Sequence, residues 1–166
     1  MGICGGYQLL GEWIRDPSGV ESHRKEVRGL CLLPIETILE KEKVVRKVSG
    51  LCLINGKRVS GYEIHMGRSS ILRRRGEPYL RIHEPGKKQT WLDGWCKEGG
   101  RIAGTYLHGI LDSPGFRGDV LNGVRRAKGL KERSPRQGRI ARFHHYDRLA
   151  DHFEVHCDVE KILSKL

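Results

Sequence analysis

Near its beginning the sequence reads Gly2-Ile3-Cys4-Gly5-Gly6-Tyr7-Gln8, and this heptapeptide indicates an α/β architecture. A Gly-x-Cys-x-Gly pattern is what a nucleophile elbow requires, because the chain there turns sharply from a strand into a helix. The backbone of the central residue is strained at such a turn. Side chains two positions before and after it would collide, which explains the glycines. The pattern predicts a strand, a turn at Cys4 and a helix that begins directly after it.

This turn would also give Cys4 its chemistry. A helix N-terminus favours the thiolate, which is the reactive form of cysteine. The backbone N–H of Gly5 would point at the carbonyl oxygen of whatever Cys4 attacks and supply half of an oxyanion hole. The alternative is a glycine-rich turn without a function, and the heptapeptide alone does not decide between the two.

A thiol nucleophile needs a base, and two of the eight histidines are candidates. His108 comes directly after a predicted strand, where α/β folds place catalytic groups. His65 closes another strand and is flanked by Gly61 and Gly67. The other six histidines lie in polar or basic stretches that are typical of a surface. His108 is the first candidate and His65 the second.

Outside these segments, the composition predicts one domain with a packed core. The chain has 166 residues, of which 37% are hydrophobic and 31% charged. It contains no run of 18 apolar residues and no signal-peptide pattern. The five cysteines are odd in number and form no Cys-x-x-Cys pair, which argues against a disulfide framework and a zinc ribbon. A reducing cytoplasm is the compartment we expect.

The net charge is +11, and the basic residues are unevenly distributed along the chain. Nine basic and two acidic residues lie between Arg117 and Arg142. A solvated basic face is the simplest interpretation. A nucleic-acid-binding module is an alternative from another functional class, and it predicts binding that weakens steeply with salt. Aromatic residues do not interleave this segment, since Phe116 and Phe143 only flank it, so we expect no nucleic acid partner.

Periodicity and turn residues predict a mixture of strands and helices. Asn55-Gly56 is a strong signal for a hairpin between strands 44–54 and 57–64. The remaining expected strands are 27–34, 80–83, 90–96 and 101–107. The expected helices are 7–14, 115–128 and 146–163, and a loop is expected over 131–142.

The elbow resembles the nucleophile motif of class I, triad-type, glutamine amidotransferases, and more narrowly that of the cobyric acid synthase branch. Four further stretches resemble the same branch and keep its order. They are Gly29-Leu-Cys-Leu-Leu-Pro34 with Thr37 and Lys43 behind it, Gly61-Tyr-Glu-Ile-His-Met-Gly67, Gly104-Thr-Tyr-Leu-His-Gly109 and Tyr146-Asp-Arg-Leu-Ala-Asp151. Together they cover nearly the whole chain, and the Gly61–Gly67 stretch is the most specific.

The resemblance implies a flavodoxin-like α/β domain, with a mixed or parallel sheet flanked by helices and the elbow at the carboxyl edge. It implies that Cys4 forms a glutamyl thioester and that His108 is its acid and base partner. Gly5 and Gln8 would line the glutamine site. Glu63 and His65 belong to a motif of this branch, and we expect them at the substrate without a defined task.

The resemblance also implies a pathway and partners. In that family the domain hydrolyses glutamine and passes ammonia to an ATP-dependent synthetase domain, which amidates carboxylates of adenosylcobyrinic acid a,c-diamide in cobalamin biosynthesis. No P-loop motif occurs in this sequence, so we expect ATP and magnesium to belong to the synthetase domain, and no cofactor in this chain. Related amidotransferases, acting on cobyrinic acid or in cell-wall synthesis, are the alternatives within the same chemistry.

Two departures from the family pattern matter. Many triad amidotransferases carry a glutamate two residues after the histidine, whereas Ile110 stands there in this chain. A dyad is therefore expected, with Asp112 or Glu63 as candidates for an orienting carboxylate. In addition, only three residues precede Cys4. We expect residues 1–166 to be a partial amidotransferase domain that lacks its N-terminal strands and the upstream synthetase domain, and such a fragment could be inactive.

Overall fold

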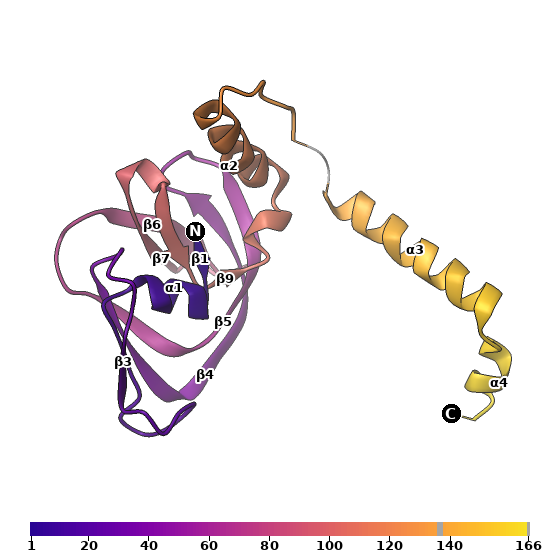
Figure 1. Ribbon diagram of the computed structural model, residues 1–166, viewed down its shortest axis with the longest axis horizontal. Coiled ribbons are helices and arrows are strands. Elements are labelled where there is room, and N and C mark those ends of the chain that lie inside the picture. The colour runs from indigo at the N-terminus through magenta and orange to yellow at the C-terminus, as the bar shows by residue number, and fades with distance from the viewer. Residues whose placement is uncertain (136–137, 166) are drawn as a thin grey trace.

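The structure is a computed structural model that describes residues 1–135 and 138–165, with side chains for 1–135 and 143–165. Its strands are β1 (Gly2–Ile3), β2 (Trp13–Arg15), β3 (Glu26–Arg28), β4 (Ile35–Cys52), β5 (Arg58–Ile71), β6 (Glu77–His83), β7 (Thr90–Lys97), β8 (Ile102–Thr105) and β9 (Leu107–His108). Its helices are α1 (Gly5–Leu10), α2 (Pro114–Ala127), α3 (Gly138–His156) and α4 (Val159–Leu163), with 3-10 turns η1 (Glu98–Gly100) and η2 (Ile110–Asp112). Figure 1 shows their arrangement.

The described strands form one mixed sheet in the order β1-β8-β7-β6-β4-β2-β3, and β5 pairs with β4 and β9. Two pairings are parallel, β1 with β8 and β2 with β4, and the others are antiparallel. Helix α1 packs against β1 and β8, while α2 packs against η2 and β5. The expected α/β class, a mixed sheet flanked by helices, is confirmed.

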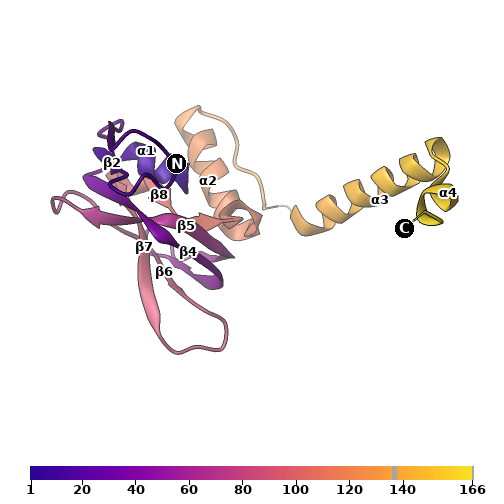
Figure 2. The ribbon, with the colours of Figure 1, turned by 90° about the horizontal axis from the view of Figure 1, so that it is seen from below.

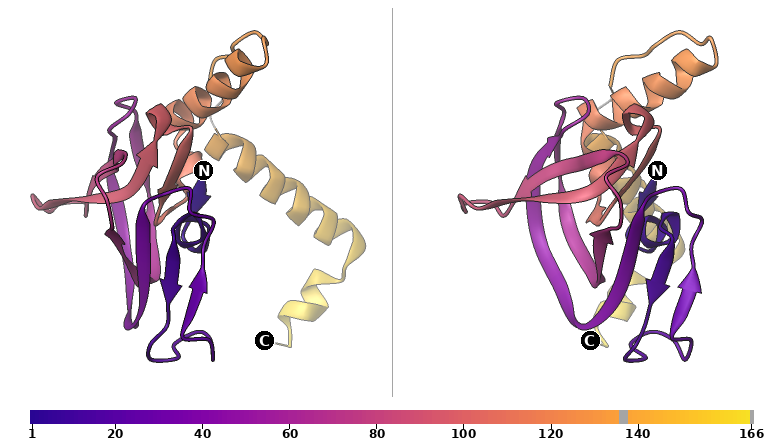
Figure 3. Two further views of the ribbon diagram at one scale, coloured as in Figure 1. Left: turned by 60° about the vertical axis from the view of Figure 1, so that its left-hand side comes forward. Right: turned by 90° about the vertical axis from the view of Figure 1, so that its left-hand side faces the viewer.

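The longest element is the hairpin of β4 and β5, whose strands curve together through the molecule (Figure 3). Its turn lies at Asn55-Gly56, as the sequence predicts, and Gly56 has a φ of 65°, a value that glycine adopts without strain. A register shift between Leu39 and Val44 interrupts the pairing. Strand β5 carries the motif Gly61–Gly67 past the elbow, so this hairpin brings two of the expected site segments together.

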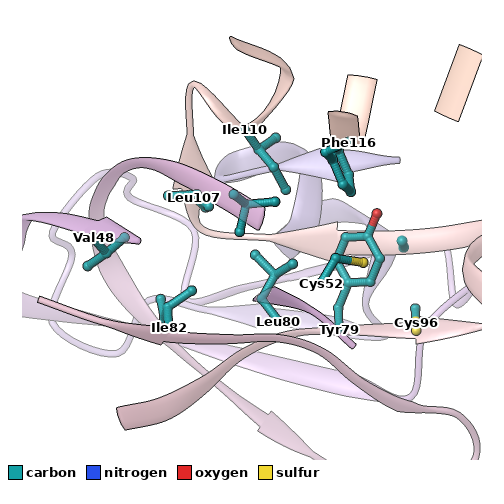
Figure 4. Packing of buried hydrophobic residues seen from close by; sticks show 11 residues of the cluster. Val48, Cys52, Tyr79, Leu80, Ile82, Cys96, Leu107, Ile110 and Phe116 are labelled. Carbon is teal, nitrogen blue, oxygen red and sulfur yellow. The ribbon is translucent and has the colours of Figure 1, made fainter. Parts of the chain in front are cut away.

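The main core lies where β4, β5, β6 and β7 meet η2 and α2 (Figure 4). Phe116 of α2 is fully buried, and its ring meets Tyr79 edge-on with centroids 6.3 Å apart. The other buried members include Val48, Cys52, Leu80, Ile82, Cys96, Leu107 and Ile110. Leu107 and Ile110 flank His108 in sequence, so the core fixes the chain on both sides of that histidine.

The C-terminal helices lie apart from the sheet. Helix α3 lies to one side of the sheet, and α4 follows it (Figures 1 and 2). The described side chains of α3 are exposed, the apolar Phe143, Tyr146, Leu149 and Phe153 among them. None of the helices in the described part of the chain has the length and hydropathy that crossing a bilayer requires.

Two expected elements in the N-terminal part of the chain have different limits in the structure. The helix predicted over 7–14 ends at Leu10, because Gly11 has extended backbone angles and residues 13–15 pair with β4 as strand β2. The strand predicted over 27–34 is wrong beyond Arg28. The backbone there turns to hydrogen-bond α1 instead, with Leu30 N–H donating to Leu9 O at 2.8 Å.

The C-terminal expectations also change. The loop predicted over 131–142 is wrong from Gly138, where α3 begins, and its residues 136–137 lie outside the described part. The single helix predicted over 146–163 is two helices. Asp158 caps the second of them by accepting a hydrogen bond from Lys161 N–H at 3.0 Å.

Candidate active site

Cys4 stands at a strained turn between β1 and α1. Its φ of 53° and ψ of −116° are unusual for any residue with a side chain, and this is the backbone that a nucleophile elbow needs. Its N–H donates to Thr105 O of β8 at 2.9 Å, which fixes the turn to the neighbouring strand. A Cβ on Gly2 would overlap the carbonyl group of Gly6, so Gly2 has the steric role that the spacing predicts. The same prediction for Gly6 is wrong, because a Cβ there would meet no atom within 4 Å.

Replacing Gly2 by alanine therefore has an expected cost. The added methyl group would displace the Gly6 carbonyl and open the elbow, and overpacking of this kind destabilises by about 1–3 kcal/mol. We expect Gly2→Ala to lower the melting temperature and to slow alkylation of Cys4. The control is Gly123→Ala in α2, where a Cβ would meet only the end of the Arg126 side chain at 3.8 Å. Unchanged melting and Cys4 reactivity in Gly2→Ala would contradict the steric role of this glycine.

Cys4 and His108 meet at one atom, the backbone carbonyl oxygen of Ile64. The Cys4 Sγ lies 3.4 Å from this oxygen, and His108 Nε2 lies 3.2 Å from it. A carbonyl oxygen only accepts hydrogen bonds, so the thiol and the Nε2–H both donate to it. Strand β9 brings His108 there by pairing with β5 at Tyr62. The structure thus brings together the two residues that the sequence proposes as nucleophile and base.

The residues on either side of Ile64 form a buried ion network. Glu63 Oε2 accepts from Arg46 Nε at 2.6 Å, and Glu63 Oε1 lies 3.1 Å from His65 Nε2. Burial raises the pKa of the Glu63 carboxyl, but hydrogen bonds from His65 and Arg46 outweigh it and hold this pKa below its usual value. Both Glu63 oxygens are thus engaged by Arg46 and His65. That Asp112 or Glu63 orients His108 stays a prediction.

His65 faces the interior beside the elbow instead of contacting Cys4. Its Nδ1 lies 2.7 Å from Gly67 O, and its ring stacks on Tyr106 with centroids 4.0 Å apart. His65 lies one residue from the carbonyl that Cys4 and His108 share.

Gln8 and Gly5 occupy different surroundings. Gln8 is buried under the elbow, with Nε2 3.5 Å from the Tyr106 hydroxyl, which in turn lies 2.8 Å from Ser69 Oγ. Gly5 opens onto free space, because a Cβ there would meet no atom within 4 Å. Gly5 therefore leaves its side of the elbow open to a ligand, whereas Gln8 supports the elbow from beneath. Their roles at glutamine remain predictions.

Sequence reasoning missed two groups at this site. One is the Ile64 carbonyl, which has no residue-type signature. The other is Asp93 on β7, which is 5% exposed and accepts hydrogen bonds from the Thr105 side chain and from Tyr106 N–H. The dipeptide Asp93-Gly94 inside a predicted strand was an available signal, since it favours a turn or bulge. Gly94 does have a positive φ of 76°.

Burial raises the pKa of Asp93 to about 6. Hydrogen bonds from Thr105 and Tyr106 oppose this rise, and of the charged groups that face it, Glu63 adds to the rise while His65 opposes it. Because the folded pKa exceeds the unfolded one, this carboxyl favours the fold most below about pH 4. That contribution is lost as the pH rises through about 6.

This sign predicts a pH-dependent difference between the wild type and Asp93→Asn. The amide does not ionise, so the variant escapes the cost of a buried charge above pH 6. We expect the melting temperature of Asp93→Asn to rise relative to the wild type between pH 4.5 and pH 7.5, measured by thermal denaturation. Groups that titrate in both proteins cancel in the comparison. A difference that stays constant with pH would show that Asp93 does not ionise in this range.

Comparison with known proteins agrees with this geometry. The family model described as CobB/CobQ-like glutamine amidotransferase domain matches residues 1–116, which include Cys4, Glu63, His65 and His108.

Among curated relatives, a cobyric acid synthase of Dehalococcoides mccartyi (strain ATCC BAA-2266 / KCTC 15142 / 195) is 42% identical, over 100% of this chain and 34% of its own length. A cobyric acid synthase of Geobacillus sp. (strain WCH70) is 44% identical, over 100% of this chain and 32% of its own length. A cobyric acid synthase of Clostridium botulinum (strain Kyoto / Type A2) is 42% identical, over 99% of this chain and 34% of its own length. The chain spans about a third of the length of these relatives. On the match over residues 1–116, the chain belongs to the CobB/CobQ-like glutamine amidotransferase domain family.

Proposed function

We propose that this chain hydrolyses glutamine to glutamate and ammonia through a thioester on Cys4. The observation that carries the proposal is the convergence of Cys4 Sγ and His108 Nε2 on the Ile64 carbonyl, beside a strained elbow. A ligand that donates to the Ile64 carbonyl in their place would free the Cys4 thiol and the His108 ring to pair with each other. In the tautomer that carries its proton on Nδ1, His108 Nε2 would then accept the thiol proton and leave a thiolate.

The reaction follows in two halves. The Cys4 thiolate attacks the carboxamide carbon of glutamine, and the resulting oxyanion takes a hydrogen bond from Gly5 N–H. His108 returns its proton to the nitrogen, the carbon–nitrogen bond breaks, and ammonia leaves a glutamyl thioester. His108 then takes a proton from water, whose oxygen attacks the thioester. Glutamate leaves and Cys4 regains its proton.

For the ammonia we propose a use that the relatives support. The matching proteins are named cobyric acid synthases, and this chain corresponds to about a third of their length. Their name and the resemblance in the motifs support ammonia transfer to an ATP-dependent synthetase that amidates carboxylates of adenosylcobyrinic acid a,c-diamide. On this proposal glutamine is the substrate of the chain, the synthetase is its partner, and ATP binds to the synthetase.

The test of the thioester is covalent labelling with a glutamine-mimicking diazoketone, followed by peptide mass spectrometry. The chain contains five free cysteines, and two of them, Cys31 and Cys157, are exposed. These two serve as internal controls for the labelling reaction. We expect label on Cys4 alone and protection by glutamine. Label spread over the exposed cysteines, or none on Cys4, would overturn the proposed chemistry.

The ammonia acceptor needs a separate test. The matching third of the Geobacillus relative can be replaced by this chain, and corrinoid amidation measured with glutamine and with free ammonia. We expect the chimera to use both nitrogen sources. Amidation with free ammonia alone would show that this chain does not deliver ammonia to that synthetase.

A further inference from the structure

Asp93 is a buried carboxylate that the thioester mechanism does not use. It lies on β7, directly before Gly94, whose positive φ of 76° ends the regular pairing with β8. This bend folds the carboxylate over the end of β8. There Oδ2 accepts from the Thr105 hydroxyl, and Oδ1 accepts from Tyr106 N–H at 3.2 Å.

The corner held by Asp93 is the point where the chain leaves one strand pairing and joins another. Thr105 ends β8, which pairs with β1, and Leu107 begins β9, which pairs with β5. Tyr106 stands between them and is 5% exposed. The Asp93 carboxylate satisfies two donors at this break, the Thr105 hydroxyl and the Tyr106 N–H.

The segments that carry Cys4 and His108 are both hydrogen-bonded to Thr105 at this corner. Thr105 O accepts the Cys4 N–H at 2.9 Å and so fixes the elbow. The Thr105 hydroxyl accepts the Leu107 N–H at 3.0 Å, which fixes the strand that carries His108. A hydroxyl that accepts from Leu107 can direct its own proton only outward, and Asp93 is the acceptor that receives it. One side chain thereby sets the direction of this hydroxyl.

We propose that Asp93 is a positioning residue for glutamine hydrolysis, which holds the Thr105–Tyr106 corner and, through it, the relative placement of Cys4 and His108. The inference rests on the proposed function of these two residues. Asp93 touches neither of them, so its contribution is to geometry. Its buried charge costs stability above pH 6, and this cost is consistent with a position kept for function rather than for the fold.

The test measures the maximal rate and the half-saturation concentration of Cys4 alkylation by the diazoketone, together with the melting temperature. Asp93→Asn keeps an acceptor for Tyr106 N–H but presents an N–H₂ group to Thr105. Thr105→Val removes the hydroxyl and keeps the shape. We expect each to lower the maximal rate about 10- to 100-fold with an unchanged half-saturation concentration, because small misplacements of reacting groups carry such costs.

Two controls separate positioning from general stability. Thr105→Ser keeps the hydroxyl and is expected to restore the rate to within about twofold of the wild type. Asp16→Asn is the matched carboxylate, since Asp16 is 3% exposed and accepts backbone N–H groups of Val20, Glu21 and Ser22 in another loop. We expect it to lower the melting temperature without changing the labelling rate.

The outcomes distinguish the two proposals. A wild-type chain that is not labelled at Cys4 overturns the proposed function and this inference with it. If the wild type is labelled at Cys4, and Asp93→Asn and Thr105→Val are both labelled at the wild-type rate, the inference alone is overturned. If the Asp93 variant does not fold, Thr105→Val still decides, and combining the two changes should slow the labelling no further than either one does.

Discussion

Replacing Cys4 by alanine is expected to abolish covalent labelling by the diazoketone and to lower glutamine hydrolysis by at least about 10³-fold. The thioester requires the sulfur, and no other cysteine shares the Ile64 carbonyl with His108. Alanine also fits the elbow, since it adds no atom to the strained turn. The melting temperature should therefore change little, and ammonia release together with mass spectrometry gives the measurement.

Cys31 provides a close control for this substitution. It is a free, exposed cysteine and also has a positive φ, at 56°. Cys31→Ala should keep the wild-type rate, because its sulfur hydrogen-bonds the carbonyl oxygen of Gly29, at 3.8 Å, and not the carbonyl that Cys4 and His108 share. Retained hydrolysis in Cys4→Ala, or lost hydrolysis in Cys31→Ala, would show that Cys4 is not the nucleophile.

Replacing His108 by asparagine is expected to lower the maximal rate of hydrolysis about 10²- to 10⁴-fold, the usual contribution of a general acid and base. The asparagine amide can still donate to the Ile64 carbonyl, so the packing of β9 is kept. It cannot take up the thiol proton, and both halves of the reaction need that step. The half-saturation concentration for glutamine should stay close to that of the wild type.

His83→Asn is the matched control for this prediction. His83 lies on β6, and its Nε2 is 3.3 Å from Ser49 Oγ on the neighbouring strand β4. We expect wild-type rates from this variant. A normal rate in His108→Asn would show that another residue is the base. His65, the second candidate from the sequence, would be tested next.

The elbow could be predicted from the sequence because its cause is local. A cysteine with a glycine two positions before it and another two positions after it is the pattern of a nucleophile elbow, and the structure has the expected strained Cys4. The hairpin at Asn55-Gly56 is local in the same way. His108 was found because it ends a strand, which is again a property of neighbouring residues.

The remainder of the site depends on register between distant segments. Ile64 meets Cys4 only because β5 runs past the elbow, 60 residues further along the chain. No residue type marks a backbone carbonyl as part of a site. Asp93 was invisible for a related reason, since its two donors lie 12 and 13 residues away, across a strand pairing. The short limits of α1 likewise follow from the pairing of β2 with β4.

The parallel pairing of β1 with β8 also constrains the order in which this chain can fold. Gly2 pairs with Gly104 and Ile3 with Thr105, so the partner of β1 in the described structure lies about a hundred residues further along the chain. Closing so long a loop is slow, since its entropy is lost before any contact repays it. The hairpin of β4 and β5 joins neighbouring residues, whereas the hydrogen bond from Cys4 N–H to Thr105 O, which fixes the strained turn, can form only after β8 has been made.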